Sequence, residues 1–130
     1  QGEHLQAIHS VKNYVAVTAA CLMIAKEKYN LVKGLDPIFR IAFNDVDFCL
    51  KVYSQKLFNV YTPYAILYHH ESVTVGTPEQ GNRDMNEFRK EIDFMHEKWG
   101  ELLQSDPFYN KNLTLDKEDF SLKINQEKLN

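Results

Sequence analysis

Two groups of side chains in this sequence could carry out chemistry, one acidic and one built on histidine. The acidic group lies in the run from Asn44 to Asp47, where two carboxylates open an apolar pattern typical of a helix. The second group is His69, His70 and Glu71, which follows the apolar run Ala65–Tyr68. A well-placed carboxylate can take a proton from a hydroxyl group, and imidazole together with carboxylates can bind a divalent metal ion.

The acids have a structural explanation as well as a chemical one. Asn44 is a preferred N-cap residue, and Asp45 and Asp47 would fall in the first turn, where carboxylates interact favourably with the helix dipole. Apolar residues recur at helical spacing from Val46 to Tyr53 and predict a helix that runs to about Gln55. From the residues alone, helix capping and catalysis both remain open for the two acids.

The histidines suggest a metal site of limited size. Neighbouring residues of a strand point to opposite faces, so His69 and His70 cannot both face one site, and Glu71 would share its face with His69. The spacing and the number of ligands do not match a structural zinc site. One imidazole with carboxylates suits Mn²⁺ or Mg²⁺, with substrate oxygens completing the coordination.

Several short elements must position these groups. The continuous apolar run Val15–Ile24 predicts a buried strand, with a buried helix as the alternative, because periodicity does not separate the two. Phe58–Thr62 and Ala65–Tyr68 predict two further strands, the second of which ends at the histidines. Lys26–Val32 predicts a short helix that stops at Gly34.

The clearest helix follows the loop from Val73 to Arg83, which is rich in glycine and proline. Apolar residues recur there at steps of three and four and predict one buried stripe: Met85, Phe88, Ile92, Met95 and Trp99. Charged residues, among them Glu91 and Lys98, are predicted to face solvent, and Gly100 is predicted to end the helix. After it, Asp106–Asn110 predicts a turn.

The composition is that of one globular domain of 130 residues, with a polar tail from about residue 113. Its 15 basic and 18 acidic residues give a formal charge of −3, which argues against a nucleic-acid partner. No apolar run reaches the roughly 20 residues of a membrane-spanning helix. Cys21 and Cys49 are predicted to be buried thiols of a reducing compartment, with a disulfide between them as the alternative.

Several segments, in the same order, resemble the second half of bacterial family 2 glycosyltransferases, in the branch that builds O-antigen and other surface polysaccharides. The resembling segments are Val17–Met23, Ala42–Leu50, Tyr61–Ala65, Leu67–Ser72 and Asp106–Leu113. The resemblance implies an α/β GT-A fold. This chain would be its C-terminal, acceptor-side half, a partial mixed sheet with flanking helices that lacks the nucleotide-binding half.

The resemblance also implies an activity. It is the inverting transfer of a sugar from a UDP-, GDP- or dTDP-sugar donor to a glycan or lipid-linked glycan acceptor. The family pattern places the catalytic base on Asp45 and the metal ligand on His69, with His70 as the second choice. The bound Mn²⁺ or Mg²⁺ would neutralise the leaving diphosphate. Acceptor-binding or supporting roles fall on Asn44, Asp47, Tyr64 and Glu71.

The sequence departs from the family pattern in places. Thr74, Val75 and Gly76 stand where the family often has Ser-Arg-Gly, and Lys111 replaces a proline. No Asp-x-Asp motif precedes Phe43. The chain also lacks an initiator methionine. We therefore expect it to come from a longer protein, and to bind nucleotide sugar poorly by itself.

Two other functions remain open. One is a non-catalytic interaction module that keeps the fold. The other is a small metal-dependent hydrolase that uses Asp45, Asp47, His69 and Glu71 without any nucleotide. An incomplete sheet also predicts an exposed edge or apolar face through which two copies could associate. The expected location of the whole protein is the cytoplasm, with a peripheral position at the inner face of the membrane as an option.

Overall fold

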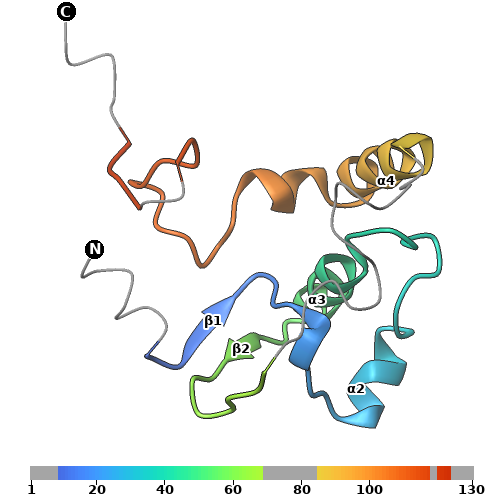
Figure 1. The fold of residues 1–130 in the computed structure, drawn as a ribbon, viewed down its shortest axis with the longest axis horizontal. Coiled ribbons are helices and arrows are strands. Elements are labelled where there is room, and N and C mark those ends of the chain that lie inside the picture. The colour runs from blue at the N-terminus through green and yellow to red at the C-terminus, as the bar shows by residue number, and fades with distance from the viewer. Residues whose placement is uncertain (1–8, 69–84, 118–119, 124–130) are drawn as a thin grey trace, which may run out of the picture.

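The computed structural model describes residues 9–68, 85–117 and 120–123. In chain order they form the strand β1 (Lys12–Tyr14), the 3-10 turn η1 (Ala19–Cys21), the helices α2 (Lys26–Leu31) and α3 (Asn44–Ser54), the strand β2 (Asn59–Tyr61) and the helix α4 (Met85–Gln104). The two strands pair antiparallel, with Asn13 opposite Val60. Figure 1 shows this small sheet and α2 beside α3, with α4 on the other side of α3. The described part is thus a mixed structure of three α-helices and one two-stranded antiparallel sheet.

The helix α3 is the centre of the described core. Phe48 and Val52 pack with Val32, directly after α2, whereas Leu50 packs with Phe39 and with Met95 of α4. Each such buried apolar side chain contributes about 1.5–3 kcal/mol. The predicted helix from Asn44 to about Gln55 is confirmed. It packs against neighbours on two sides, because its buried residues do not lie on one narrow stripe. These buried residues are Asp47, Phe48, Cys49, Leu50 and Val52.

The start of α3 differs from the predicted cap. Asn44 is the first helical residue, and Phe43 occupies the N-cap position without a side-chain capping bond. The backbone of Phe43 is left-handed, with φ 62° and ψ 0°, and its carbonyl accepts the N–H of Asp47 at 2.8 Å. A non-glycine residue in such a region costs about 1–3 kcal/mol. The surroundings of Phe43 must therefore stabilise it, and its ring stacks on Phe88 of α4 with centroids 5.7 Å apart.

The predicted strand Val15–Ile24 is wrong, and so is the alternative of a buried helix. The middle of the run is the exposed turn η1, where the Thr18 hydroxyl oxygen accepts the Ala20 N–H at 3.3 Å. Met23 is 99% exposed. Side chains provide hydrogen-bond partners for this backbone. Besides Thr18, the Asn59 amide donates to the Val15 carbonyl at 2.9 Å. Such side-chain bonds offer the backbone an alternative to a sheet ladder.

Of the two later strands, one is confirmed and one is wrong. Phe58–Thr62 forms β2 around Asn59–Tyr61, but Ala65–Tyr68 has no regular structure. A turn at Pro63 precedes it, in which the Tyr64 N–H donates to the Thr62 hydroxyl at 3.4 Å. Within the described ranges the segment pairs with no strand, and Tyr68 is 94% exposed.

The predicted helices are confirmed, with two corrections to α4. The helix α2 forms, and Gly34 follows it with φ 63°. The helix α4 does not end at Gly100 but continues to Gln104. Glu91, which was predicted to face solvent, is 4% exposed. No helix among the described residues is long and apolar enough to cross a membrane.

The remaining predictions concern the cysteines and the C-terminal segment. Cys49 is buried as predicted, Cys21 is exposed, and both thiols are free. The predicted turn after α4 is confirmed, since the Asp106 carboxylate accepts the Phe108 N–H at 2.8 Å. Beyond it, Leu113 forms an isolated antiparallel bridge with Leu122.

Candidate functional site

Asp45 and Asp47 lie in the same turn of α3 but in different surroundings. Asp45 is half-buried, whereas Asp47 is fully buried. One carboxylate oxygen of Asp45 accepts the N–H of Ala19 at 3.2 Å, and the other accepts the N–H of Val46 at 2.9 Å. Backbone donors from two separate segments thus orient a carboxylate that is still open to solvent. A general base must lie within hydrogen-bond reach of the hydroxyl group whose proton it takes, and an oriented carboxylate that solvent can reach is suited to that role.

Asp47 is bound by side chains of α4. Its Oδ1 accepts the indole N–H of Trp99 at 2.8 Å and lies 2.7 Å from the ammonium of Lys98. The Lys51 ammonium is 3.3 Å from Oδ2, at ion-pair distance but outside hydrogen-bond geometry, so Oδ2 accepts no hydrogen bond. A carboxylate this buried and this occupied supports the packing of α3 on α4. The two acids therefore have separate roles available to them.

Lys98 links three parts of the chain at this point. It binds Asp36 at 3.0 Å as well as Asp47. Burial by itself would lower the pKa of Lys98, but the hydrogen bonds and charges of the two carboxylates raise it above 10.5. Burial would raise the pKa of Asp36, yet the contacts from Lys98 and from the Ile38 N–H lower it. The ammonium also lies within cation–π distance of three rings: Phe39, Phe94 and Trp99 at 5.8, 5.5 and 5.5 Å.

Glu91 is the site residue that sequence reasoning missed. Its Oε1 accepts the N–H groups of Arg40 and Ile41 at 2.7 and 2.9 Å, and its Oε2 accepts that of Ala42 at 2.9 Å. Burial alone would raise the pKa of Glu91, but these three bonds and the charge of Arg40 lower it below 4.5. A buried, ionised carboxylate thus fixes three successive peptide groups at the entry to α3.

A sequence signal for this buried face does exist. Phe88, Glu91, Met95 and Lys98 recur at steps of three, four and three, which is the spacing of one helical face. The stripe of apolar residues leaves out Glu91 and Lys98. A charged residue is seldom fully buried unless it is paired, so both were predicted to face solvent. Here both are paired, Glu91 with backbone N–H groups and Lys98 with two carboxylates.

The other predicted site residues are not all placed by the structure. Asn44 is exposed at the first position of α3, and Tyr64 is 85% exposed in the turn after β2. His69, His70 and Glu71 lie outside the described residues. Among the residues that are described, no group of three or more His, Cys, Asp or Glu could hold a metal ion.

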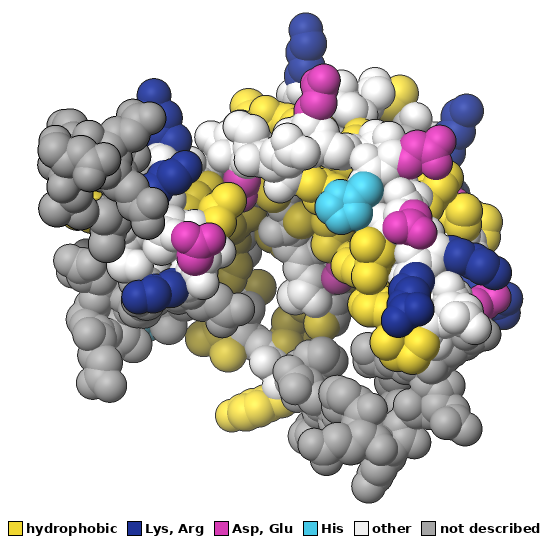
Figure 2. Space-filling model, turned by 90° about the horizontal axis from the view of Figure 1, so that it is seen from above, with side chains coloured by type: hydrophobic (Ala, Val, Ile, Leu, Met, Phe, Trp, Pro, Cys, Tyr) yellow, Lys and Arg dark blue, Asp and Glu magenta, His cyan; other side chains and the backbone are white. Residues whose placement is uncertain are grey.

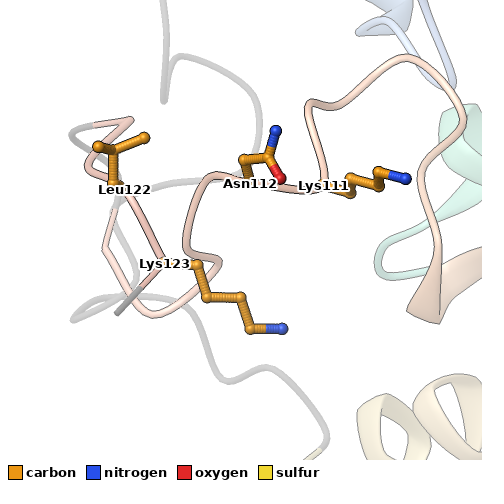
Figure 3. A pocket seen from close by; sticks show the side chains of 4 residues that line it. All are labelled: Lys111, Asn112, Leu122 and Lys123. Carbon is orange, nitrogen blue, oxygen red and sulfur yellow. The ribbon is translucent and has the colours of Figure 1, made fainter. Parts of the chain in front are cut away.

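Two hollows on the described surface lie away from Asp45. One of about 330 Å³ is lined by Lys111, Asn112, Leu122 and Lys123, and Figure 3 shows the two ammonium groups lying apart. The other, of about 400 Å³, follows α4 from His96 to Leu102. Figure 2, which looks onto the α4 side, shows acidic and basic side chains intermixed on this face. The candidate site therefore remains the start of α3.

Comparison with known proteins relates the chain to segments of two much longer ones. It is 45% identical over 128 residues to the uncharacterized protein y4gI of Sinorhizobium fredii, an alignment that covers 93% of this chain and 14% of the relative. It is 28% identical over 117 residues to the O-antigen biosynthesis protein RfbC of Myxococcus xanthus, covering 89% of this chain and 9% of that protein. No family model and no solved structure was found to match. The chain is thus similar to a small segment of a protein named for O-antigen biosynthesis.

Proposed function

We propose that this chain is the acceptor-side part of an inverting glycosyltransferase of surface-polysaccharide synthesis, with Asp45 as the catalytic base. The observation that carries the proposal is the contrast within one helical turn. Asp45 is oriented by backbone N–H groups and open to solvent, whereas Asp47 is fully buried and bound by Lys98. The resemblance of Ala42–Leu50 to the family motif supports the proposal, as does the similarity to a protein named for O-antigen biosynthesis.

The proposed reaction uses Asp45 at the acceptor. Its carboxylate takes the proton of the acceptor hydroxyl while that oxygen attacks the anomeric carbon of the donor sugar. The bond from that carbon to the nucleoside diphosphate breaks on the opposite side, which inverts the configuration. The N–H groups of Ala19 and Val46 keep the carboxylate oriented, and the exposed side chains of Asn44 and Tyr64 are available to contact the acceptor.

The proposed cofactor is Mn²⁺ or Mg²⁺, which when bound would neutralise the charge of the leaving diphosphate. Asp47 is fully buried among Lys98, Trp99 and Lys51 and is not proposed as a ligand. The proposed ligand is His69, with His70 as the second choice and Glu71 in support, on the family pattern alone. The donor is a UDP-, GDP- or dTDP-sugar, and the acceptor is a glycan or lipid-linked glycan. The nucleotide-binding half of the GT-A fold lies outside this chain.

A non-catalytic interaction module is the second candidate. The run from Tyr64 to Tyr68 presents exposed apolar and aromatic side chains, and exposed apolar patches often mark sites of protein association. This candidate predicts that substitutions at Asp45 change no activity.

The test is made in a protein that carries this segment together with a nucleotide-binding half. Asp45→Asn is expected to lower sugar transfer by about 100- to 10,000-fold, the usual contribution of a general base, while the affinity for the donor stays the same. Transfer is followed by the released nucleoside diphosphate, and donor binding by calorimetry with Mn²⁺. Asp93→Asn, at an exposed position of α4, is the control. An Asp45→Asn variant with full transfer activity rules out Asp45 as the base.

A further inference from the structure

We infer that Glu91 is a positioning residue for Asp45, acting through the backbone of residues 40–43. This inference rests on the proposed role of Asp45 as the base. Glu91 itself is buried and faces the entry to α3, so it is not in a position to touch the acceptor or the donor.

One face of α4 binds the whole entry segment of α3, residues 40–43. Glu91 accepts the N–H groups of Arg40, Ile41 and Ala42, and Phe88, one turn earlier on α4, stacks on the ring of Phe43. Four successive residues are therefore held by two side chains of a single helix. A segment bound in this way has little freedom to change the direction in which it enters α3.

The direction in which the chain enters α3 depends on Phe43. Its left-handed backbone turns the chain into the helix, and its carbonyl accepts the first helical hydrogen bond, from the N–H of Asp47. A non-glycine residue adopts this conformation only where its surroundings impose it. The contacts of Glu91 lie directly before it in the chain. Loss of these contacts would let Phe43 relax toward ordinary backbone angles and would rotate the first turn of α3, which carries Asp45.

The Glu91 carboxylate has few alternative arrangements. Burying a carboxylate is costly unless it is paired or hydrogen-bonded, and both oxygens of Glu91 accept hydrogen bonds from the three N–H groups. Charge-assisted hydrogen bonds of this kind are roughly twice as strong as neutral ones. The position of the entry segment is therefore fixed by chemistry specific to an ionised side chain, and a neutral substitute of the same shape will not reproduce it.

A first experiment uses the chain itself and needs no activity. The N–H of Ala19 bonds to Asp45 and has no contact with Glu91 in the structure, so its hydrogen exchange reports the position of the Asp45 carboxylate. In Glu91→Gln, the amides of residues 40–42 and of Ala19 are expected to exchange several-fold faster, while the amide of Leu50 in the middle of α3 is unchanged. Glu97→Gln, an exposed position of the same helix, is the matched control. Unchanged exchange at Ala19 overturns the inference.

A second experiment separates positioning from a general loss of structure. In the protein used for the transfer assay, Glu91→Gln is expected to lower kcat by about 10- to 100-fold, the range for a slight misplacement of a reacting group, with the donor KM unchanged. In an Asp45→Asn background the same substitution is expected to have almost no further effect under single-turnover conditions, because residues that act as a unit are not additive. Glu91→Asp keeps the charge and is expected to retain more activity than Glu91→Gln, which keeps the test decisive if the glutamine variant folds poorly.

The possible failures are distinguishable. Equal losses from Glu91→Gln in both backgrounds overturn the positioning role and leave Asp45 as the base. Full transfer by Asp45→Asn overturns the proposed function, whatever Glu91 does. In that case the exchange rate of the Ala19 amide still decides whether Glu91 holds the Asp45 carboxylate in place.

Discussion

Replacing Lys98 with methionine tests whether α4 is attached to α3 through the buried carboxylate of Asp47. Methionine has a similar length and keeps the contacts with the surrounding aromatic rings, but it removes the ammonium 2.7 Å from Asp47. Removing one partner of a buried ion pair costs about 3–5 kcal/mol, because a charge remains uncompensated. The structure calls for a lower value here, for two reasons.

The first reason is that Asp47 keeps two neighbours, the indole N–H of Trp99 at 2.8 Å and the ammonium of Lys51 at 3.3 Å. The second is that the Lys98 side chain is 25% exposed, so water reaches part of the site. We therefore expect Lys98→Met to lower the free energy of unfolding by about 2–3 kcal/mol. Loss of the partly exposed pair with Asp36 adds less than about 1 kcal/mol. The total is a large share of the roughly 5–15 kcal/mol that stabilises an ordinary domain.

The assay is urea unfolding followed by tryptophan fluorescence. Trp99 is the single tryptophan of the sequence, and its indole contacts Asp47 directly, so the signal comes from the altered site. Lys90→Met, at an exposed position of α4, is the control and should change stability by no more than about 0.5 kcal/mol. A Lys98→Met variant within that same range of the wild type would refute the attachment of α4 through Asp47.

Three further predictions concern single positions. Gly34→Ala is expected to destabilise the chain by at least about 1–2 kcal/mol in urea unfolding, because φ is 63° and a Cβ would lie 2.6 Å from the hydroxyl of Tyr29; an unaltered midpoint would contradict this. Gly100→Ala, inside α4 and with no atom beyond its chain neighbours and the nearby helix backbone within 4 Å of the new Cβ, should instead stabilise it by about 0.5–1 kcal/mol; a loss of stability would show that the helix is not regular there. The lowered pKa of Glu91 means that the folded state binds fewer protons than the unfolded state just below pH 4.5, so stability should fall as the pH drops through the folded pKa. Urea unfolding between pH 7 and 3 should show a smaller loss of stability in Glu91→Gln than in the wild type. Equal losses in both proteins would contradict this contribution of the Glu91 carboxylate.

The helices were predictable from the sequence because their signals are local. The spacing of apolar residues in α3 and α4 reflects burial against the rest of the domain, and the structure confirms both helices. The conformation of Val15–Ile24 was not predictable in this way, since an apolar run does not reveal which partners its backbone will find. Here Thr18 and Asn59 provide those partners through their side chains.

The site was predictable only in part, for a similar reason. The acidic motif marked Asp45 and Asp47, and only the family resemblance assigned them different roles. The physical difference between them lies in residues of α4 that contact Asp47 and not Asp45. Glu91 and Lys98 looked like solvent-facing charges. Their burial depends on partners that lie far away in the chain, and no local pattern records those partners.

The contacts made by α4 have a consequence for how the protein folds. The hydrogen bonds from the entry segment to Glu91 and from Trp99 to Asp47 join residues 49 to 52 positions apart. Helices form within about a microsecond, but contacts between distant residues must first overcome the entropy of closing a long loop. Asp45 is therefore expected to acquire its orientation in a late step of folding, after α3 and α4 already exist. During synthesis, Asp45 leaves the ribosome well before the residues of α4 that bind the entry segment and Asp47.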